Sequence, residues 1–355
     1  MPGMGLPVRL LWFDDGYMSV SVSPTQASTN RTGVGLPAVG PQWFGMAMGT
    51  GIFATLLQLA GPMIPGSVDL ARVMLALAWM ILLGLVAATA TRFRAEPGAL
   101  RATVTDAAVA PTWGMVAMGI LAVGSASATV AHAWYVAAAM WGIGTVLGLC
   151  TAIGFGVVML RGRAGTPTMV WGLALVPPMV SATTGASLAQ HFSAHAGTFL
   201  AVSTACFVIA LATAPITFAR CYHHHLRVAP PVGAASASAW IPLGVVGQSA
   251  AAALKLSDVA GLGHTVAVGY AVAMLVLAAP LTAWAGYRTV LGFRDAMPFT
   301  PGWWAMTFPV GTVALGAHEL GAQTHWAWAT DVSLAALAVL ACTWTLCAAM
   351  SIRSL

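Results

Sequence analysis

Ionisable side chains are scarce in this chain of 355 residues, so those that stand in or beside apolar stretches are the first candidates for chemistry. Lys255 is the only lysine, and it ends the apolar stretch 238–256. His318 and Glu319 stand together near the end of another apolar stretch, 302–321. A histidine or carboxylate in apolar surroundings can take up and release a proton, whereas a lysine attracts anions. His318 and Glu319 are therefore candidates for proton coupling, and Lys255 is a candidate for anion attraction at the outer mouth of a path.

Each candidate has a plainer alternative. Lys255 could anchor its helix at a membrane interface or form an ion pair with Asp258, three residues further on. Glu319 could be solvated at the same interface. His191 and His195 are four residues apart, which suits metal ligands on one helix face, but no third ligand follows nearby in the sequence. We therefore expect no metal site and no cofactor.

No catalytic motif supports an enzyme. The chain has no GxSxG, no HExxH and no phosphate-binding glycine loop in a suitable context. Its composition excludes most soluble classes as well, because 59% of the residues are hydrophobic and 6% are charged, against about 25% charged in soluble domains. The net charge of +5 gives no reason to expect a nucleic-acid partner, since the basic residues report membrane orientation instead.

Ten apolar stretches are long enough to cross a bilayer, which takes about 20 residues in a helix. We therefore expect an all-α integral membrane protein with ten transmembrane helices. The expected spans are 42–60, 70–91, 111–131, 133–160, 168–190, 196–219, 238–256, 264–290, 302–321 and 327–350. Residues 1–36, rich in Gly, Pro, Ser and Thr, are expected to form a flexible cytoplasmic tail, and residues 37–355 the membrane domain.

The arginines predict the orientation. With the N-terminus in the cytoplasm, only Arg72 and Lys255 fall outside, and twelve arginines fall on the cytoplasmic side, as the positive-inside rule requires. Those twelve are Arg9, Arg31, Arg92, Arg94, Arg101, Arg161, Arg163, Arg220, Arg227, Arg288, Arg294 and Arg353. Both termini are therefore expected in the cytoplasm. An arginine-rich, alanine-rich composition suggests a GC-rich bacterial genome and hence the inner (plasma) membrane.

An internal repeat divides the chain into five helical hairpins. The pattern PxWxxxAMG occurs at 41–49 and again at 111–119, and a looser PxW occurs at 301–303. Tryptophans near the starts of the odd-numbered spans, at 43, 113, 171, 240 and 303, follow one another after 70, 58, 69 and 63 residues. The odd spans carry small and polar residues, while the even spans are bulkier. All odd spans run in the same direction, which predicts a quasi-five-fold ring around a central pore.

Small and hydroxyl-bearing residues of the odd spans are the predicted pore lining: Gly49, Thr50, Gly51, Ser125, Thr183, Thr184, Gly247, Gln248, Thr307 and Pro309. The alternative is that such residues only allow close helix packing. Pro177, Pro178, Pro242 and Pro309 are expected to kink their helices. The parallel helix N-termini should attract anions at the cytoplasmic mouth, because each carries about half a positive charge.

Two stretches carry a resemblance to a known family. At "PQWFGMAMGTGIFA" (41–54) and "WWAMTFPVGTVAL" (303–315), the sequence resembles the tellurite-resistance/dicarboxylate transporter family, which includes the bacterial TehA proteins, yeast malate and sulfite transporters and plant guard-cell slow anion channels. The resemblance covers about residues 37–352. It implies a trimer of five-hairpin rings, each with an uncharged central pore.

The resemblance also implies a gate and a function. A phenylalanine of the ninth span blocks the pore in relatives, and Phe308 in "TFPVG" looks like that residue, with Thr307 and Pro309 beside it. Alternatively, Phe308 is a core aromatic and Phe53 takes that role. The expected function is an anion channel or transporter for small anions, such as chloride or nitrate, or for organic dicarboxylates. The alternative is a proton-coupled carrier of malate or sulfite.

Overall fold

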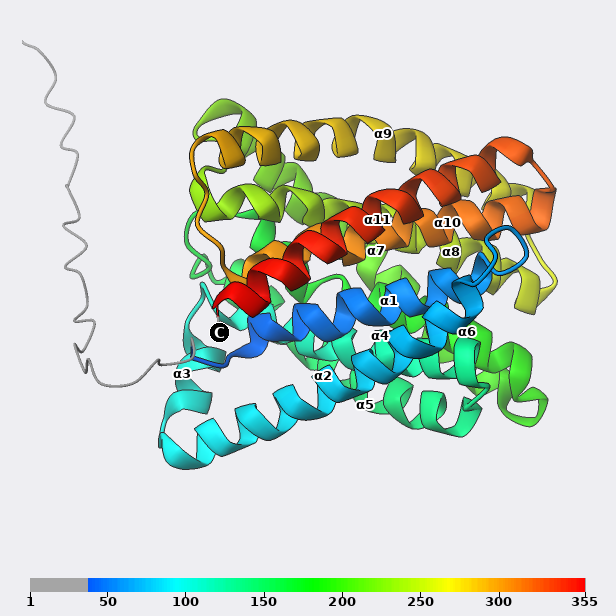
Figure 1. Ribbon diagram of the computed structural model, residues 1–355, viewed down its shortest axis with the longest axis horizontal. Helices are drawn as coiled ribbons and strands as arrows, with labels where there is room; N and C mark the ends of the chain where they lie inside the picture. Colours follow the sequence, from blue (N-terminus) through cyan, green and yellow to red (C-terminus); the bar gives the residue numbers. More distant parts are fainter. Residues whose placement is uncertain (1–37, 355) are drawn as a thin grey trace, which may run out of the picture. The chain divides into compact units, whose positions relative to one another are not determined.

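The computed structural model describes residues 38–354, and every regular element among them is a helix. The predicted N-terminal tail, 1–36, lies outside the described residues. Long helices run side by side along the molecule (Figure 1). Five of them are mostly buried, and each follows a 3-10 segment: η1 Pro41–Phe44 and α1 Gly45–Leu59, η2 Ala110–Thr112 and α4 Trp113–Ala131, η3 Met169–Ala174 and α6 Pro177–His191, η5 Gly233–Trp240 and α8 Ile241–Ala260, η6 Pro301–Met306 and α10 Phe308–Thr324.

Longer helices alternate with these in the chain. They are α2 Ser67–Ala95, α5 Trp134–Leu160, α7 Ala196–Arg227, α9 His264–Arg294 and α11 Ala327–Ser354. A short helix, α3 Ala99–Thr105, lies in the connection after α2, and a 3-10 turn, η4 Ser193–His195, precedes α7. Helix α7 extends eight residues beyond the expected span 196–219, and its C-terminal part carries three consecutive histidines at 223–225.

Eight helices of the described part are long and apolar enough to cross a membrane. The expectation was ten, and the shortfall concerns α1 and α10, which have 15 and 17 residues. The chain is therefore an all-helical membrane protein.

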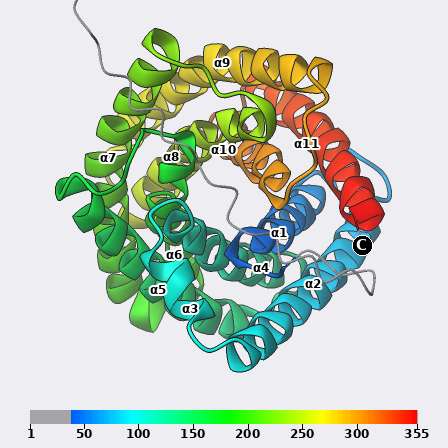
Figure 2. The same cartoon turned by 90° about the vertical axis from the view of Figure 1, so that its left-hand side faces the viewer.

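The mostly buried helices form a closed cycle of contacts. Helix α1 packs against α4, α4 against α6, α6 against α8, α8 against α10, and α10 against α1. Figure 2 shows these helices on the inside, with α2, α5, α7, α9 and α11 around them. Burial follows the same division: 78–94% of the most apolar window is buried in the inner helices α4, α6 and α8, against 17–28% in the outer helices. The bulky even-numbered stretches are therefore the ones that face the surroundings.

Glycines allow two of the inner contacts. A Cβ atom on Gly51 would lie 2.9 Å from the backbone carbon of Ala122 on α4, and one on Gly247 would lie 2.4 Å from the backbone of Thr312 on α10. Such distances leave no room for any side chain, so the helix axes approach closely only because these residues are glycine.

Aromatic donors tie the outer helices to the inner ones. Trp79 on α2 donates its indole N–H to Ser127 on α4, and Trp141 on α5 donates to the backbone oxygen of Ser181 on α6. On the other side, Tyr270 on α9 donates to Ser249 on α8. Several polar side chains of the inner helices are thus acceptors for outer helices.

The same kind of bond joins the first and the last α-helix of the described part, because Trp344 Nε1 on α11 lies 3.0 Å from Thr50 Oγ1 on α1. Replacing Trp344 with phenylalanine is expected to lower the stability by about 1 kcal/mol, the net value of one such hydrogen bond. The thermal unfolding of detergent-solubilised protein measures this effect. Trp328→Phe is the matched control, since Trp328 is half-exposed on the same helix and its indole donates to no described residue. Equal melting temperatures for the two variants would contradict the prediction.

The expected proline kinks are wrong. Pro177, Pro242 and Pro309 occupy the first or second position of α6, α8 and α10, and Pro178 follows Pro177. A proline in the first turn removes no intrahelical hydrogen bond, so it starts the helix there and does not bend it. Among the described residues, the prolines inside helices are Pro215 of α7 and Pro280 of α9, both on outer helices.

Candidate functional site

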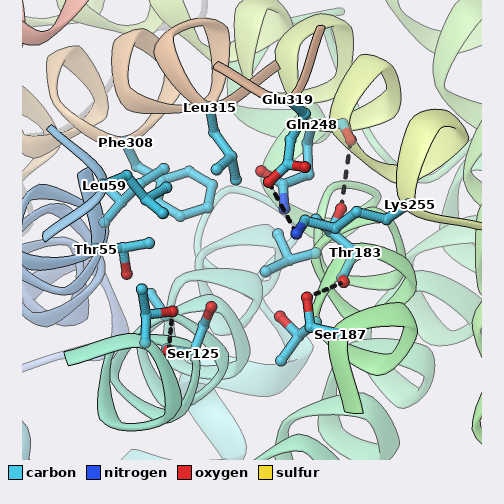
Figure 3. A pocket seen from close by; sticks show the side chains of 15 residues that line it. Thr55, Leu59, Ser125, Thr183, Ser187, Gln248, Lys255, Phe308, Leu315 and Glu319 are labelled. Carbon is cyan, nitrogen blue, oxygen red and sulfur yellow. Dashed lines mark hydrogen bonds and ion pairs between the residues drawn. The ribbon is translucent and has the colours of Figure 1, made fainter. Parts of the chain in front are cut away.

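A cavity of about 70 Å³ lies among the inner helices, and all five of them contribute to its lining. A buried water needs roughly 10–15 Å³ of such space, so the cavity has room for several waters or for a small anion. Figure 3 shows polar side chains from different helices pointing toward one another across it. The lining consists of Ile52, Thr55, Leu59, Ala122, Ser125, Thr129, Val180, Thr183, Thr184, Ser187, Gln248, Lys255, Phe308, Leu315 and Glu319.

The lining residues recur at a constant distance from the repeated tryptophans. In α1, α4 and α6 they stand 9, 12 and 16 residues after the tryptophan, as Ile52, Thr55 and Leu59; Ala122, Ser125 and Thr129; and Val180, Thr183 and Ser187. These intervals place them on one helix face over two turns. In α10, Leu315 and Glu319 stand 12 and 16 residues after Trp303, and in α8 Lys255 stands 15 after Trp240. We call Leu59, Thr129, Ser187, Lys255 and Glu319 the distal layer.

Lys255 and Glu319 form an ion pair inside this cavity. The distance from Lys255 Nζ to Glu319 Oε1 is 2.8 Å, and the two side chains are 18% and 13% exposed (Figure 3). The alternative pairing of Lys255 with Asp258 is wrong, because Asp258 Oδ2 lies 2.6 Å from Gln190 Nε2 on α6 instead. His318 is next to Glu319 in the sequence but does not line the cavity.

Phe308 stands at the other end of the lining. It is the first residue of α10, it is 2% exposed, and its ring borders the cavity. Glu319 lies eleven positions further along the same helix, which corresponds to about 16 Å along the helix axis. Phe53, the substitute candidate, does not line the cavity; its ring packs against Trp344 on α11 with centroids 5.8 Å apart.

Of the predicted lining residues, four border the cavity: Ser125, Thr183, Thr184 and Gln248. The others lie elsewhere for identifiable reasons. Gly49, Gly51 and Gly247 lie at helix contacts, where a Cβ would meet Thr307, Ala122 and Thr312 respectively. Thr50 donates to the backbone oxygen of Met46 and accepts from Trp344, so it faces an outer helix.

Thr307 and Pro309 flank Phe308 but do not border the cavity. Thr307 is fully buried at the junction of η6 and α10 and donates to the backbone oxygen of Trp304 at 2.7 Å. Pro309 holds the start of α10 and lies near Gly244 on α8. Both residues therefore position the turn that carries the phenylalanine ring.

Several lining residues escaped the sequence analysis, among them Thr55, Thr129, Ser187 and the apolar Leu59 and Leu315. The repeat could have identified them. Had the tryptophans been used to align the five hairpins, the positions 9, 12 and 16 residues later would have coincided in the first three. Small side chains are a weaker guide, because they also occur at packing contacts.

Comparisons with known proteins agree with this architecture. The family model described as voltage-dependent anion channel (SLAC1) matches residues 38–352. The sulfite efflux pump SSU1 of Arthroderma otae is 25% identical over 338 residues, which cover 87% of this chain and 88% of the relative. The corresponding pumps of Arthroderma benhamiae and Trichophyton rubrum are 23% and 24% identical over 363 residues, covering 95% of this chain and 96% of each relative.

These matches confirm the family resemblance drawn from the two motifs. The family consists of channels and transporters and not of enzymes, and its members act on anions across membranes. The relatives named here are fungal, so they give no support to a bacterial inner membrane. With the family model matching residues 38–352, this chain belongs to the voltage-dependent anion channel family of membrane transport proteins.

Proposed function

We propose that this protein passes small anions along the axis of its inner helices, through a path that Phe308 closes. The observation that carries the proposal is the cavity itself. All five inner helices contribute to it, Phe308 borders one end, and the Lys255–Glu319 pair stands in the distal layer. A cavity inside a closed cycle of helices is separated from lipid, so polar side chains there serve a solute and not the bilayer.

The proposal includes ten membrane spans in a quasi-five-fold ring. Helices α1 and α10 are short, but each is preceded by a 3-10 segment. At 2.0 Å per 3-10 residue and 1.5 Å per α residue, η1 with α1 extends roughly 30 Å and η6 with α10 roughly 37 Å. The hydrocarbon core is about 30 Å thick, so both lengths suffice. The tryptophan spacing supports the same five-fold repeat.

Orientation and assembly complete the proposal. Both termini lie in the cytoplasm, because twelve of the fourteen basic residues then fall on that side. The membrane is a plasma membrane, and the arginine-rich composition is the only support for a bacterial one. A homotrimer follows from the family resemblance, and the apolar outer helices supply surfaces for both lipid and neighbouring subunits.

The anion-binding character of the path has two physical sources. The N-termini of the inner helices point toward the cytoplasm in this orientation, and together they favour negative charge at that mouth. Within the path, Ser125, Thr183, Thr184 and Gln248 offer hydroxyl and amide groups without charge. Chloride, nitrate or a similar small anion suits such a path, and so does an organic dicarboxylate passing lengthwise.

A second candidate function is a proton-coupled carrier of sulfite or malate. Two observations favour it: the relatives are named sulfite efflux pumps, and Glu319, a group able to carry a proton, lies in the cavity. His318 is the weaker candidate for coupling, because it does not border the cavity.

Electrical recording of the purified protein in planar bilayers tests the proposal. Under asymmetric salt we expect anion-selective reversal potentials, and replacing chloride with nitrate, malate or sulfite ranks the ions. Protein-free bilayers are the control. If no current appears, while a pH gradient drives saturable sulfite or malate uptake into proteoliposomes, the carrier is correct and the channel is not. Absence of both activities contradicts the proposed function.

A further inference from the structure

The charge in the cavity is confined to one pair of side chains. Among the lining residues that the structure describes, only Lys255 and Glu319 carry charge, and both belong to the distal layer. Their side chains are mostly buried, and 2.8 Å separates Nζ from Oε1. The pair is neutral overall, so a simple anion that approaches the ammonium group also approaches the carboxylate. The distal layer thus favours an anion that can also donate a hydrogen bond over one that can only accept hydrogen bonds.

The hydroxyl groups of the lining also favour a ligand that can donate a hydrogen bond. Four of them already donate to carbonyl oxygens of their own helices, and they are those of Thr55, Thr129, Thr183 and Ser187. A hydroxyl group has one proton, so each of these offers a ligand only lone pairs. Ser125 and Thr184 form no side-chain hydrogen bond with the described residues and remain free to donate. The cavity therefore presents both donors and acceptors to a ligand.

The side chain of Gln248 independently indicates that the cavity binds a ligand. Its side chain is 3% exposed and borders the cavity, yet its carbonyl oxygen Oε1 has no hydrogen-bond partner within the described part of the chain. A buried amide without a partner is unfavourable by the free energy of a lost hydrogen bond. The amide can present either its oxygen or its nitrogen, since the two ends are interchangeable by rotation. A ligand with a donor and an acceptor satisfies it in both orientations.

We propose that the Lys255–Glu319 pair, with Gln248, selects anions that carry an acidic hydroxyl group of their own. Hydrogensulfite is an example of such a ligand, because it is a small monoanion with charged oxygens and one O–H group. Its oxygens accept from Lys255 and from the free hydroxyls, while its O–H donates to the Glu319 carboxylate. Chloride and nitrate have no O–H and leave the carboxylate without a partner. The inference rests on the proposed function, because it assigns the selectivity of the same path.

Two matched anions test this assignment. Methanesulfinate has the pyramidal sulfur, the two oxygens and the single negative charge of hydrogensulfite, with a methyl group where the hydroxyl stands. Flux of each into proteoliposomes is measured at one mildly acidic pH, with nitrate for comparison. The protein as it stands is expected to prefer hydrogensulfite over methanesulfinate by roughly ten- to a hundredfold, the factor that a charge-assisted hydrogen bond supplies. In Glu319→Gln the preference falls toward unity and nitrate flux rises, because Lys255 is left without its carboxylate.

Controls separate selectivity from folding. Asp69→Asn removes the exposed ion pair with Arg72 on α2, 2.9 Å in length and outside the cavity, and it is expected to keep the original ratio. Elution of each variant in size-exclusion chromatography reports folding. If Glu319→Gln does not fold, Gln248→Met decides, since it keeps the volume and removes only the amide. It is expected to lower hydrogensulfite flux severalfold and to leave methanesulfinate flux unchanged.

A folded Glu319→Gln, or in its place a folded Gln248→Met, that retains the full preference for hydrogensulfite overturns the inference and leaves the proposed function intact. An original protein that moves neither these anions nor nitrate faster than protein-free liposomes overturns both. The two failures differ in what is measured, since the first concerns a ratio of fluxes and the second their presence.

Discussion

Phe308→Ala is expected to raise anion flux roughly tenfold or more, since lowering a barrier by about 1.4 kcal/mol already gives a factor of ten. The ring is 2% exposed, stands at the start of α10 and borders the cavity from the side of the helix N-termini. Removing the ring is expected to open the cavity at that end. The helix start should survive, because Pro309 and the buried Thr307 on either side still hold the turn. Bilayer currents of the variant and of the original protein measure the effect.

Phe53→Ala is the matched control for this prediction. Phe53 is also buried, at 6% exposure, but it packs against Trp344 and does not border the cavity. Truncating a core phenylalanine costs about 3–5 kcal/mol, so this variant should lose stability without gaining conductance. Unchanged currents in a folded Phe308→Ala variant would remove Phe308 as the gate. A gain in Phe53→Ala alone would transfer that role to Phe53.

Gly247→Ala is expected to lower the stability by about 1–3 kcal/mol or more, as overpacking of a tight contact does. The added Cβ would lie 2.4 Å from the backbone of both Thr312 and Val313, and backbone atoms cannot turn away as a side chain can. Helices α8 and α10 would have to separate, which also breaks the 3.1 Å bond from Thr312 Oγ1 to the backbone oxygen of Leu243. Lower folded yield and an earlier thermal transition in detergent are the expected readings.

Gly269→Ala gives the reference for that substitution. A Cβ on Gly269, in the outer helix α9, meets nothing within 4 Å. Alanine favours a helix over glycine by about 1 kcal/mol, so this variant should be as stable as the original or slightly more stable. If Gly247→Ala and Gly269→Ala unfold at the same temperature, the close approach of α8 and α10 does not hold the inner helices together.

The order of the hairpins could be predicted because it depends on local patterns. Trp43, Trp113 and Trp303 mark helix starts that the structure places near the same end of the inner helices, and the bulky stretches between them form outer helices. Hydropathy and tryptophan spacing are properties of the sequence itself, so they can be recognised without knowing which residues contact one another in the fold. Helix ends were less accurate: α7 continues to Arg227, since nothing in the apolar pattern marks its last turns.

Predictions failed where a distant residue decides the outcome. Thr50 has the residue type of a pore lining, but Trp344, 294 residues away, turns it into an acceptor for an outer helix. Lys255 has a carboxylate three residues away in Asp258, yet it pairs with Glu319 on another helix, while Asp258 accepts from Gln190. Small residues carry the same ambiguity: Gly51 at a helix contact and Ser125 at the cavity look equally suited to a pore.

The regular spacing of the lining residues separates the part of the molecule that holds the helices together from the part that lines the cavity. In each hairpin the tryptophans and contact glycines set the frame, while the residue about sixteen positions after the tryptophan contributes one member of the distal layer. Substitution of one residue of the distal layer changes the charge or polarity of the cavity wall and leaves the helix contacts unchanged. We therefore infer that the five side chains of the distal layer, here Leu59, Thr129, Ser187, Lys255 and Glu319, can change independently of the tryptophans and glycines that hold the inner helices together.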